Sequence, residues 1–214
     1  MNLPLSSVFR YAGWIAAGLC AAAAIGFSAA IDGYSHASYP LALLGAKAMP
    51  RAFAFNLLAF VIPGLLVAWI VARLRTQLSD TASWAARIGA RMLLLSAFAF
   101  VAQGVLPLDL EELEGVVSGW HATVWMLWWI AYTAGGVSLA TGLRRSPVWR
   151  SFAATTMIAA VTVPVFALFV SQLLPAGFAQ RLAFAIWFAW AIAAGHAVSR
   201  IEASGSGSSP TTRK

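Results

Sequence analysis

The chain is built from long apolar runs that are separated by short polar connections. Each run is long enough for the roughly 20 helical residues that cross a hydrocarbon core. Lipid offers no hydrogen-bond partner to free backbone groups, so the runs should be helices, and they lack the alternation of barrel strands. We predict an all-α integral membrane protein, a bundle of six transmembrane helices. The predicted helices lie near residues 10–31, 51–72, 88–106, 119–142, 150–174 and 181–200.

Composition supports lipid as the solvent of this chain. Of its 214 residues, 61% are hydrophobic and only 10% are charged, whereas soluble domains carry about 25% charged residues. A water-soluble fold of this size could not bury so much apolar surface. The net charge of +7 does not form a patch, because the basic residues fall between the apolar runs. We therefore expect membrane lipids, and no nucleic acid, as partners.

The distribution of Lys and Arg predicts the orientation. Eleven basic residues fall on the side of the two termini and of the second and fourth connections, against three on the other side. Because cytoplasmic connections carry the excess of basic residues, both termini should be cytoplasmic, in the inner membrane. The three on the outer side are Lys47, Arg51 and Arg181.

The first apolar run has a second interpretation. The run at 10–31 resembles a secretory signal, with Arg10 before an Ala-rich core. It exceeds the usual length of about 7–15 apolar residues, so we favour a retained helix.

Residues 203–214 are rich in Ser, Gly, Pro and Thr, which predicts a disordered cytoplasmic tail. The single cysteine, Cys20, excludes an intrachain disulfide.

Polar residues from several predicted helices and connections converge on the outer membrane surface. Buried polar groups are costly in a membrane and are therefore candidates for function. We predict that they form an outward-facing pocket for a lipid or small amphiphile, with the Trp-rich helix at 119–142 holding the acyl part. A simpler interpretation is that Asp109 pairs with Arg181 and that His121 makes a hydrogen bond near the interface. The candidate ligand-binding residues are Asn56, Asp109, His121, Gln180 and Arg181.

A metal site is the alternative from a different functional class. His36, Asp109 and His121 could form a zinc site with an open position for water, as in a metal-dependent hydrolase of membrane lipids. The three residues come from separate segments and lack the spacing of known zinc motifs. Outside this alternative we predict no cofactor. His121 and His196 lie toward opposite surfaces and could not ligate one haem, and no lysine lies inside an apolar run for a retinal Schiff base.

A small secondary transporter is a further alternative. Pro63-Gly64 interrupts the second predicted helix and Pro164 interrupts the fifth, which are corresponding places in two three-helix halves. Such symmetry can indicate an inverted repeat, although packing kinks would look the same. No acidic residue lies at mid-depth to couple ions.

The order of short motifs resembles the bacterial and archaeal membrane family called "domain of unknown function 998". The resemblance covers about residues 10–200 and implies six transmembrane helices; it assigns no activity. The chain departs from the family pattern at Tyr39, where a histidine is frequent, and at Ala42 and Leu43, where polar residues are frequent. The motifs are Tyr39 to Ala46, Phe55-Asn56, Leu106-Pro107-Leu108-Asp109, His121, and Gln180-Arg181 followed by Trp187.

Overall fold

The computed structural model describes residues 5–78 and 82–206, and within them it contains helices and no strand. The predicted all-α architecture is confirmed. Six long helical rods account for most of the chain. They are α1 (Leu5–Ser28), the rod formed by α2 (Ala52–Asn56), a π turn (Leu57–Val61) and α3 (Ile62–Thr76), α4 (Trp84–Val105), α5 (Val116–Leu143), α6 (Arg150–Pro164) with its π and 3-10 extension to Gln172, and α7 (Ala176–Ser206).

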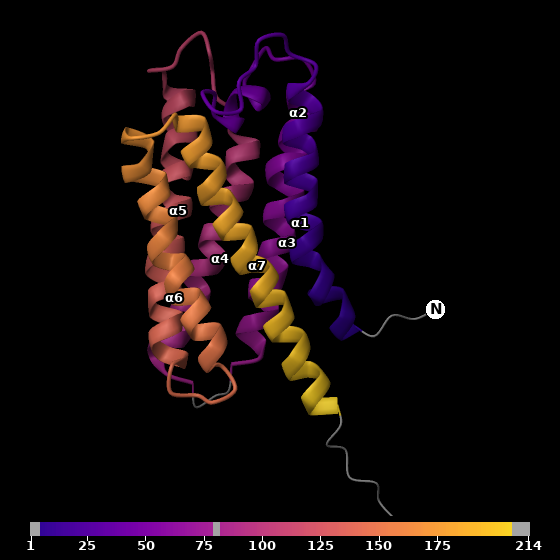
Figure 1. Cartoon of the computed structure of the whole chain (residues 1–214), viewed down its shortest axis with the longest axis vertical. Coiled ribbons are helices and arrows are strands. Elements are labelled where there is room, and N and C mark those ends of the chain that lie inside the picture. The colour runs from indigo at the N-terminus through magenta and orange to yellow at the C-terminus, as the bar shows by residue number, and fades with distance from the viewer. Residues whose placement is uncertain (1–4, 79–81, 207–214) are drawn as a thin grey trace, which may run out of the picture.

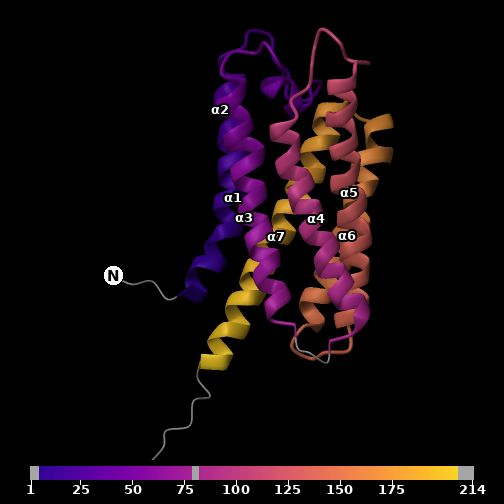
Figure 2. The ribbon, with the colours of Figure 1, turned by 180° about the vertical axis from the view of Figure 1, so that it is seen from behind.

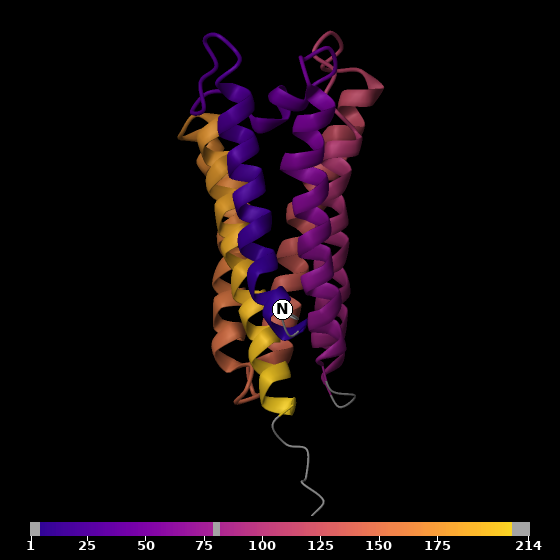
Figure 3. The ribbon, with the colours of Figure 1, turned by 90° about the vertical axis from the view of Figure 1, so that its right-hand side faces the viewer.

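The rods run along the long axis of the molecule in an up-and-down arrangement (Figures 1 and 2). In order of contact they form a closed ring, α1–α3–α4–α5–α6–α7, in which α7 returns to α1. The start of α1 and the end of α7 lie at the same end as residues 144–149, which we call the terminal end (Figure 3). Residues 29–51, 106–115 and 173–175 lie at the opposite, distal end.

Five of the described helices are long and apolar enough to cross a membrane. The fourth predicted helix, 119–142, forms as α5 but does not reach the same hydropathy, because Trp, Tyr, Gly, Ser and Thr dilute its aliphatic residues. The predicted tail is partly wrong, since α7 continues from Ala203 to Ser206; residues 207–214 lie outside the described part. The qualifying spans are Phe9–Ser28, Ala52–Thr76, Trp84–Val105, Arg150–Phe169 and Ala176–Ser204.

An aromatic core fills the ring where α4 faces α7. Phe100 stacks on Trp187 with ring centroids 4.5 Å apart, and Phe184 and Phe188 approach Phe100 edge-on. Trp128 of α5 closes this cluster and is fully buried. Offset and edge-to-face pairs are favourable for aromatic rings, so these side chains fix the spacing of the three helices.

Glycines permit the closest helix contacts. A Cβ at Gly89 of α4 would overlap the backbone of Leu139 on α5, and one at Gly135 would press on the backbone of Leu93. Gly136 packs against Ala160 of α6 in the same way. Gly135 and Gly136 therefore form a small face of α5 that packs between α4 and α6.

Both proline breaks coincide with a widened helical turn. The π turn Leu57–Val61 ends just before Pro63, and the π turn Val165–Phe169 begins just after Pro164. Proline cannot donate a backbone hydrogen bond, and a wider turn accommodates the lost bond without ending the rod.

Candidate ligand-binding site

Arg181, in the first turns of α7, is the centre of the polar cluster at the distal end. Its Nη1 donates to the carbonyl oxygens of Tyr39 and Gly177, at 2.9 and 2.8 Å. Its Nη2 donates to the hydroxyl of Tyr34 at 2.8 Å and lies 3.3 Å from Nδ1 of His36. Three of these partners are uncharged oxygen atoms, and the fourth, Nδ1 of His36, accepts when the neutral ring carries its proton on Nε2. Within the described ranges the guanidinium makes no ion pair, and its Nε is buried without a hydrogen-bond partner.

Most residues around Arg181 come from the first connection, which folds over the N-terminal end of α7. The Tyr34 hydroxyl also donates toward the carbonyl of Pro40, at 3.3 Å. Partial burial raises the pKa of Tyr34, and this effect outweighs the opposing attraction of Arg181. Tyr34 therefore stays a neutral phenol that accepts from the guanidinium and does not neutralise it.

His36 links Arg181 to the end of α1. Its Nε2 lies 3.0 Å from the hydroxyl of Ser28, which itself donates to the carbonyl of Ile25. Accepting from Arg181 at Nδ1 and donating from Nε2 to Ser28 defines one neutral tautomer of the ring. A continuous chain of hydrogen bonds thus runs from the cation on α7 to the backbone of α1.

An apolar groove of about 520 Å³ begins beneath this cluster and runs between α1 and α7. Cys20 and Ala24 line it from α1, and Phe184 and Phe188 line it from α7. Arg181 and His36 lie at one end, and Trp14 and Ile192 lie at the other. From residue 181 to residue 192 a helix rises about 16 Å. The groove therefore combines a cationic head with a long apolar wall.

Two predicted site residues fasten the distal end instead of facing the groove. Asn56 is buried, and its Nδ2 donates to the carbonyl of Gly45 at 2.8 Å. The Oε1 of Gln180 accepts from the backbone N–H of Leu41, also at 2.8 Å. Both bonds secure the short 3-10 helix Leu41–Gly45 against the helical rods.

Asp109 does not pair with Arg181, so that part of the simpler interpretation is wrong. Its carboxylate accepts from Nζ of Lys47 at 3.1 Å, and the backbone N–H of Lys47 donates to the carbonyl of Leu108. The hydrogen bond from Lys47 lowers the pKa of Asp109. The pair joins the first and third connections at the surface, where an ion pair contributes little to stability.

His121 makes a hydrogen bond, as the simpler interpretation of the sequence expected. It is buried at the start of α5, and its Nδ1 lies 2.7 Å from the carbonyl of Leu106. This bond closes the C-terminal end of α4, where backbone carbonyls lack helical partners.

The predicted residues do not share one pocket. Of the five, only Arg181 lines the groove. Over residues 5–78 and 82–206, no three His, Cys, Asp or Glu side chains are placed to hold a metal ion, so His36, Asp109 and His121 are not brought together. The acyl-sized wall is formed by α1 and α7, whereas Trp128 of the Trp-rich α5 is buried in the core.

Sequence reasoning missed the residues that form the apolar wall. Cys20, Ala24 and Phe188 belong to apolar runs in which no residue stands out. No protein-family model, curated protein or solved structure matches this chain. The resemblance to the domain of unknown function 998 therefore stays a hypothesis.

Proposed function

We propose that this chain is an integral protein of the inner membrane with six crossings and both termini in the cytoplasm. Five helices have the necessary length and hydropathy. α5 is the sixth crossing, because its 28 residues contain no charged side chain and rise about 42 Å. Basic residues concentrate at the terminal end and acidic residues in the distal connections. The positive-inside rule then places the terminal end in the cytoplasm and the distal end outside.

Within this membrane placement, we propose that the protein binds an amphiphile with an anionic head group in the groove between α1 and α7. One observation carries the proposal: Arg181 has neutral partners and no carboxylate partner within the described residues, at the mouth of an apolar groove. A guanidinium that is partly withdrawn from water is stabilised by an anion that can accept from it. The apolar wall would take the hydrocarbon chain.

Binding of radiolabelled palmitate to the full-length protein in detergent tests this proposal. Arg181→Gln should weaken binding about tenfold or more, because a charge-assisted hydrogen bond is lost. Ala185→Phe should weaken it too by filling the groove from an exposed position, which leaves the core unchanged. Arg87→Gln, an exposed arginine outside the groove, is the matched control.

Competition with unlabelled amphiphiles distinguishes recognition of the head group from nonspecific hydrophobic adsorption. Unlabelled palmitate should displace the label, and hexadecanol, which has the same chain without the charge, should displace it poorly. Equal palmitate binding by wild type, Arg181→Gln and Ala185→Phe would overturn the proposal.

A small secondary transporter is the second candidate, favoured by the paired π turns. They occupy Leu57–Val61 in the first half of the chain and Val165–Phe169 in the second, each next to a proline. Widened turns are frequent at functional sites of helices. Saturable flux of palmitate across proteoliposomes would support transport, whereas saturable binding without flux would support binding alone. The geometry favours no metal-dependent hydrolase, because the described residues present no metal-ligand cluster.

A further inference from the structure

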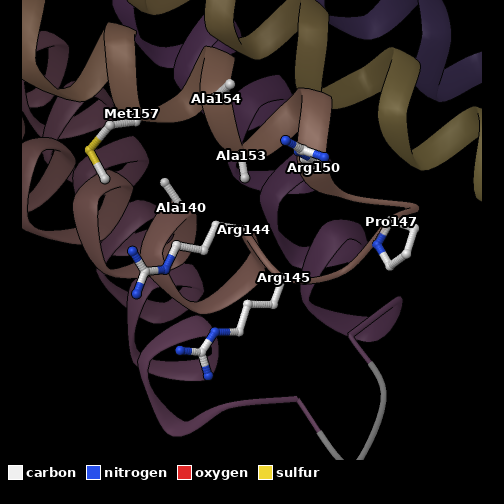
Figure 4. Close-up of a pocket in the computed structure, with 8 residues that line it drawn as sticks. All are labelled: Ala140, Arg144, Arg145, Pro147, Arg150, Ala153, Ala154 and Met157. Carbon is white, nitrogen blue, oxygen red and sulfur yellow. The ribbon is translucent and has the colours of Figure 1, made fainter.

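A second candidate site lies at the terminal end, opposite the distal end that holds Arg181. An open pocket of about 990 Å³ lies where the end of α5 meets the start of α6 (Figure 4). Arg144, Arg145 and Arg150 stand around it, and Ala153 and Met157 form part of its apolar lining. In Figure 4, Arg144 and Arg145 extend to the same side, and Arg150, in the first turn of α6, lies apart from them beyond Ala153.

The positive charge of this pocket is not compensated within the described part of the chain. Arg144, Arg145 and Arg150 are exposed and make no ion pair with any described residue. The one acidic side chain described at this end, Glu202, is bound by Arg73. Three guanidinium groups that line one hollow, with no carboxylate paired to them among the described residues, raise the local concentration of anions.

The lining shows what kind of anion fits. Guanidinium groups recognise phosphate through paired hydrogen bonds. Beyond the arginines, the pocket is lined by alanine and methionine side chains of α5 and α6. A free phosphate would use only the arginines, whereas a phospholipid would use the arginines and the apolar lining together. Basic pockets between helices on the cytoplasmic side are typical sites for anionic lipid head groups.

We propose that the pocket formed by Arg144, Arg145 and Arg150 binds the phosphate head group of an anionic phospholipid of the cytoplasmic leaflet. This inference rests on the membrane placement proposed above, and it is independent of the groove at Arg181. The acyl chains would lie against the outer face of α5 and α6, where Met157 and Ala154 line the pocket.

Native mass spectrometry of the full-length protein, titrated with phosphatidylglycerol or neutral phosphatidylcholine, tests the proposal. Arg144→Gln/Arg145→Gln/Arg150→Gln should lower phosphatidylglycerol affinity by at least about tenfold, since each arginine near a membrane surface contributes about fivefold. The matched control is Arg75→Gln/Arg87→Gln/Arg91→Gln. It removes the same charge from exposed arginines near the same end but outside the pocket, and it should change affinity much less.

A lysine variant and displacement by phosphate distinguish a specific lipid site from general electrostatic attraction and from a site for free phosphate. Arg144→Lys/Arg145→Lys/Arg150→Lys keeps the charge that orients the chain in the membrane and should lose part of the affinity, because lysine lacks the planar fork. Equal losses in the pocket variant and the matched control would overturn the site in favour of general attraction. Displacement of the lipid by millimolar inorganic phosphate would overturn the lipid assignment in favour of a free phosphate.

The experiment also separates this site from the proposed function. In an Arg181→Gln background, which removes the cation of the groove, the Gln variant of the pocket should lower phosphatidylglycerol affinity to the same extent, whatever Arg181→Gln does to palmitate binding. If the Gln variant of the pocket does not fold, Arg145→Gln alone should still lower the affinity several-fold. An unchanged affinity in that single variant, as in wild type, would contradict the proposal.

Discussion

Arg181 donates to the hydroxyl of Tyr34 at 2.8 Å and thereby joins two residues that are 147 positions apart. The same guanidinium reaches the carbonyls of Tyr39 and Gly177. One side chain of α7 therefore holds the first connection over the mouth of the groove. Substitutions at this contact should affect both the stability of the distal end and the binding of an anionic amphiphile.

Tyr34→Phe should lower the free energy of unfolding by about 1 kcal/mol, because it removes one acceptor from Arg181 and keeps the ring. Denaturant titration in detergent, followed by circular dichroism, measures this loss. Tyr11→Phe removes an exposed hydroxyl that has no hydrogen bond among the described contacts, and it is the control. Identical midpoints for Tyr34→Phe and Tyr11→Phe would contradict the expectation.

Stability should depend on pH through Asp109. The hydrogen bond from Lys47 lowers the pKa of Asp109 in the folded state, so its stabilisation is present above the unfolded pKa, about 4, and is lost as pH falls through the lower folded pKa. Asp109→Asn should therefore be slightly less stable than wild type at pH 7, as is usual for a surface ion pair, and the difference should vanish in acid. Thermal unfolding from pH 7 to pH 3 measures it. In a Lys47→Gln background, which removes the partner of the carboxylate, Asp109→Asn should show no such convergence.

Asn56→Ala should cost about 1–3 kcal/mol, because it leaves the buried carbonyl of Gly45 without its donor. Gly45→Ala should also destabilise, since a Cβ there would overlap the Asn56 side chain. The double variant should be more stable than the sum of the two losses predicts, because Asn56→Ala makes room for the new methyl group. Strict additivity in a double-mutant cycle would argue against this contact.

Gly89→Ala should destabilise the protein by about 1–3 kcal/mol, because the added methyl group meets the backbone of α5. Gly18→Ala on α1 is the matched control: its Cβ would meet nothing within 4 Å. Thermal unfolding in one detergent compares the two. A loss of the same size at both positions would indicate a general effect of replacing glycine.

Single-cysteine labelling should show whether α5 crosses the membrane. In a Cys20→Ser background, Leu113→Cys before α5 and Val148→Cys after it place thiols at exposed positions. A membrane-impermeant maleimide should label Leu113→Cys on intact cells, and Val148→Cys only after permeabilisation. Labelling of both from the same side would mean that α5 does not cross.

The helices follow from the amino-acid sequence without reference to the rest of the fold. Apolar runs of this length satisfy their backbone groups internally, and this local requirement does not depend on the neighbours. The predicted ends are displaced by up to about two turns. α7, for example, begins at Ala176 just after Pro175, and not at residue 181, because Arg181 and Gln180 are accommodated within its first turns.

Which residues contact one another depends on how the helices pack. The order of apolar runs and connections places Arg181, Asp109 and His121 toward one end of the molecule, but it sets neither the order of the helices around the ring nor their rotation. Asp109 therefore pairs with Lys47, and Arg181 faces α1 across the groove. Many of the partners are backbone carbonyls, such as those of Gly45, Leu106 and Tyr39. Every residue carries such a carbonyl, so its availability depends on the local fold and leaves no mark in the sequence.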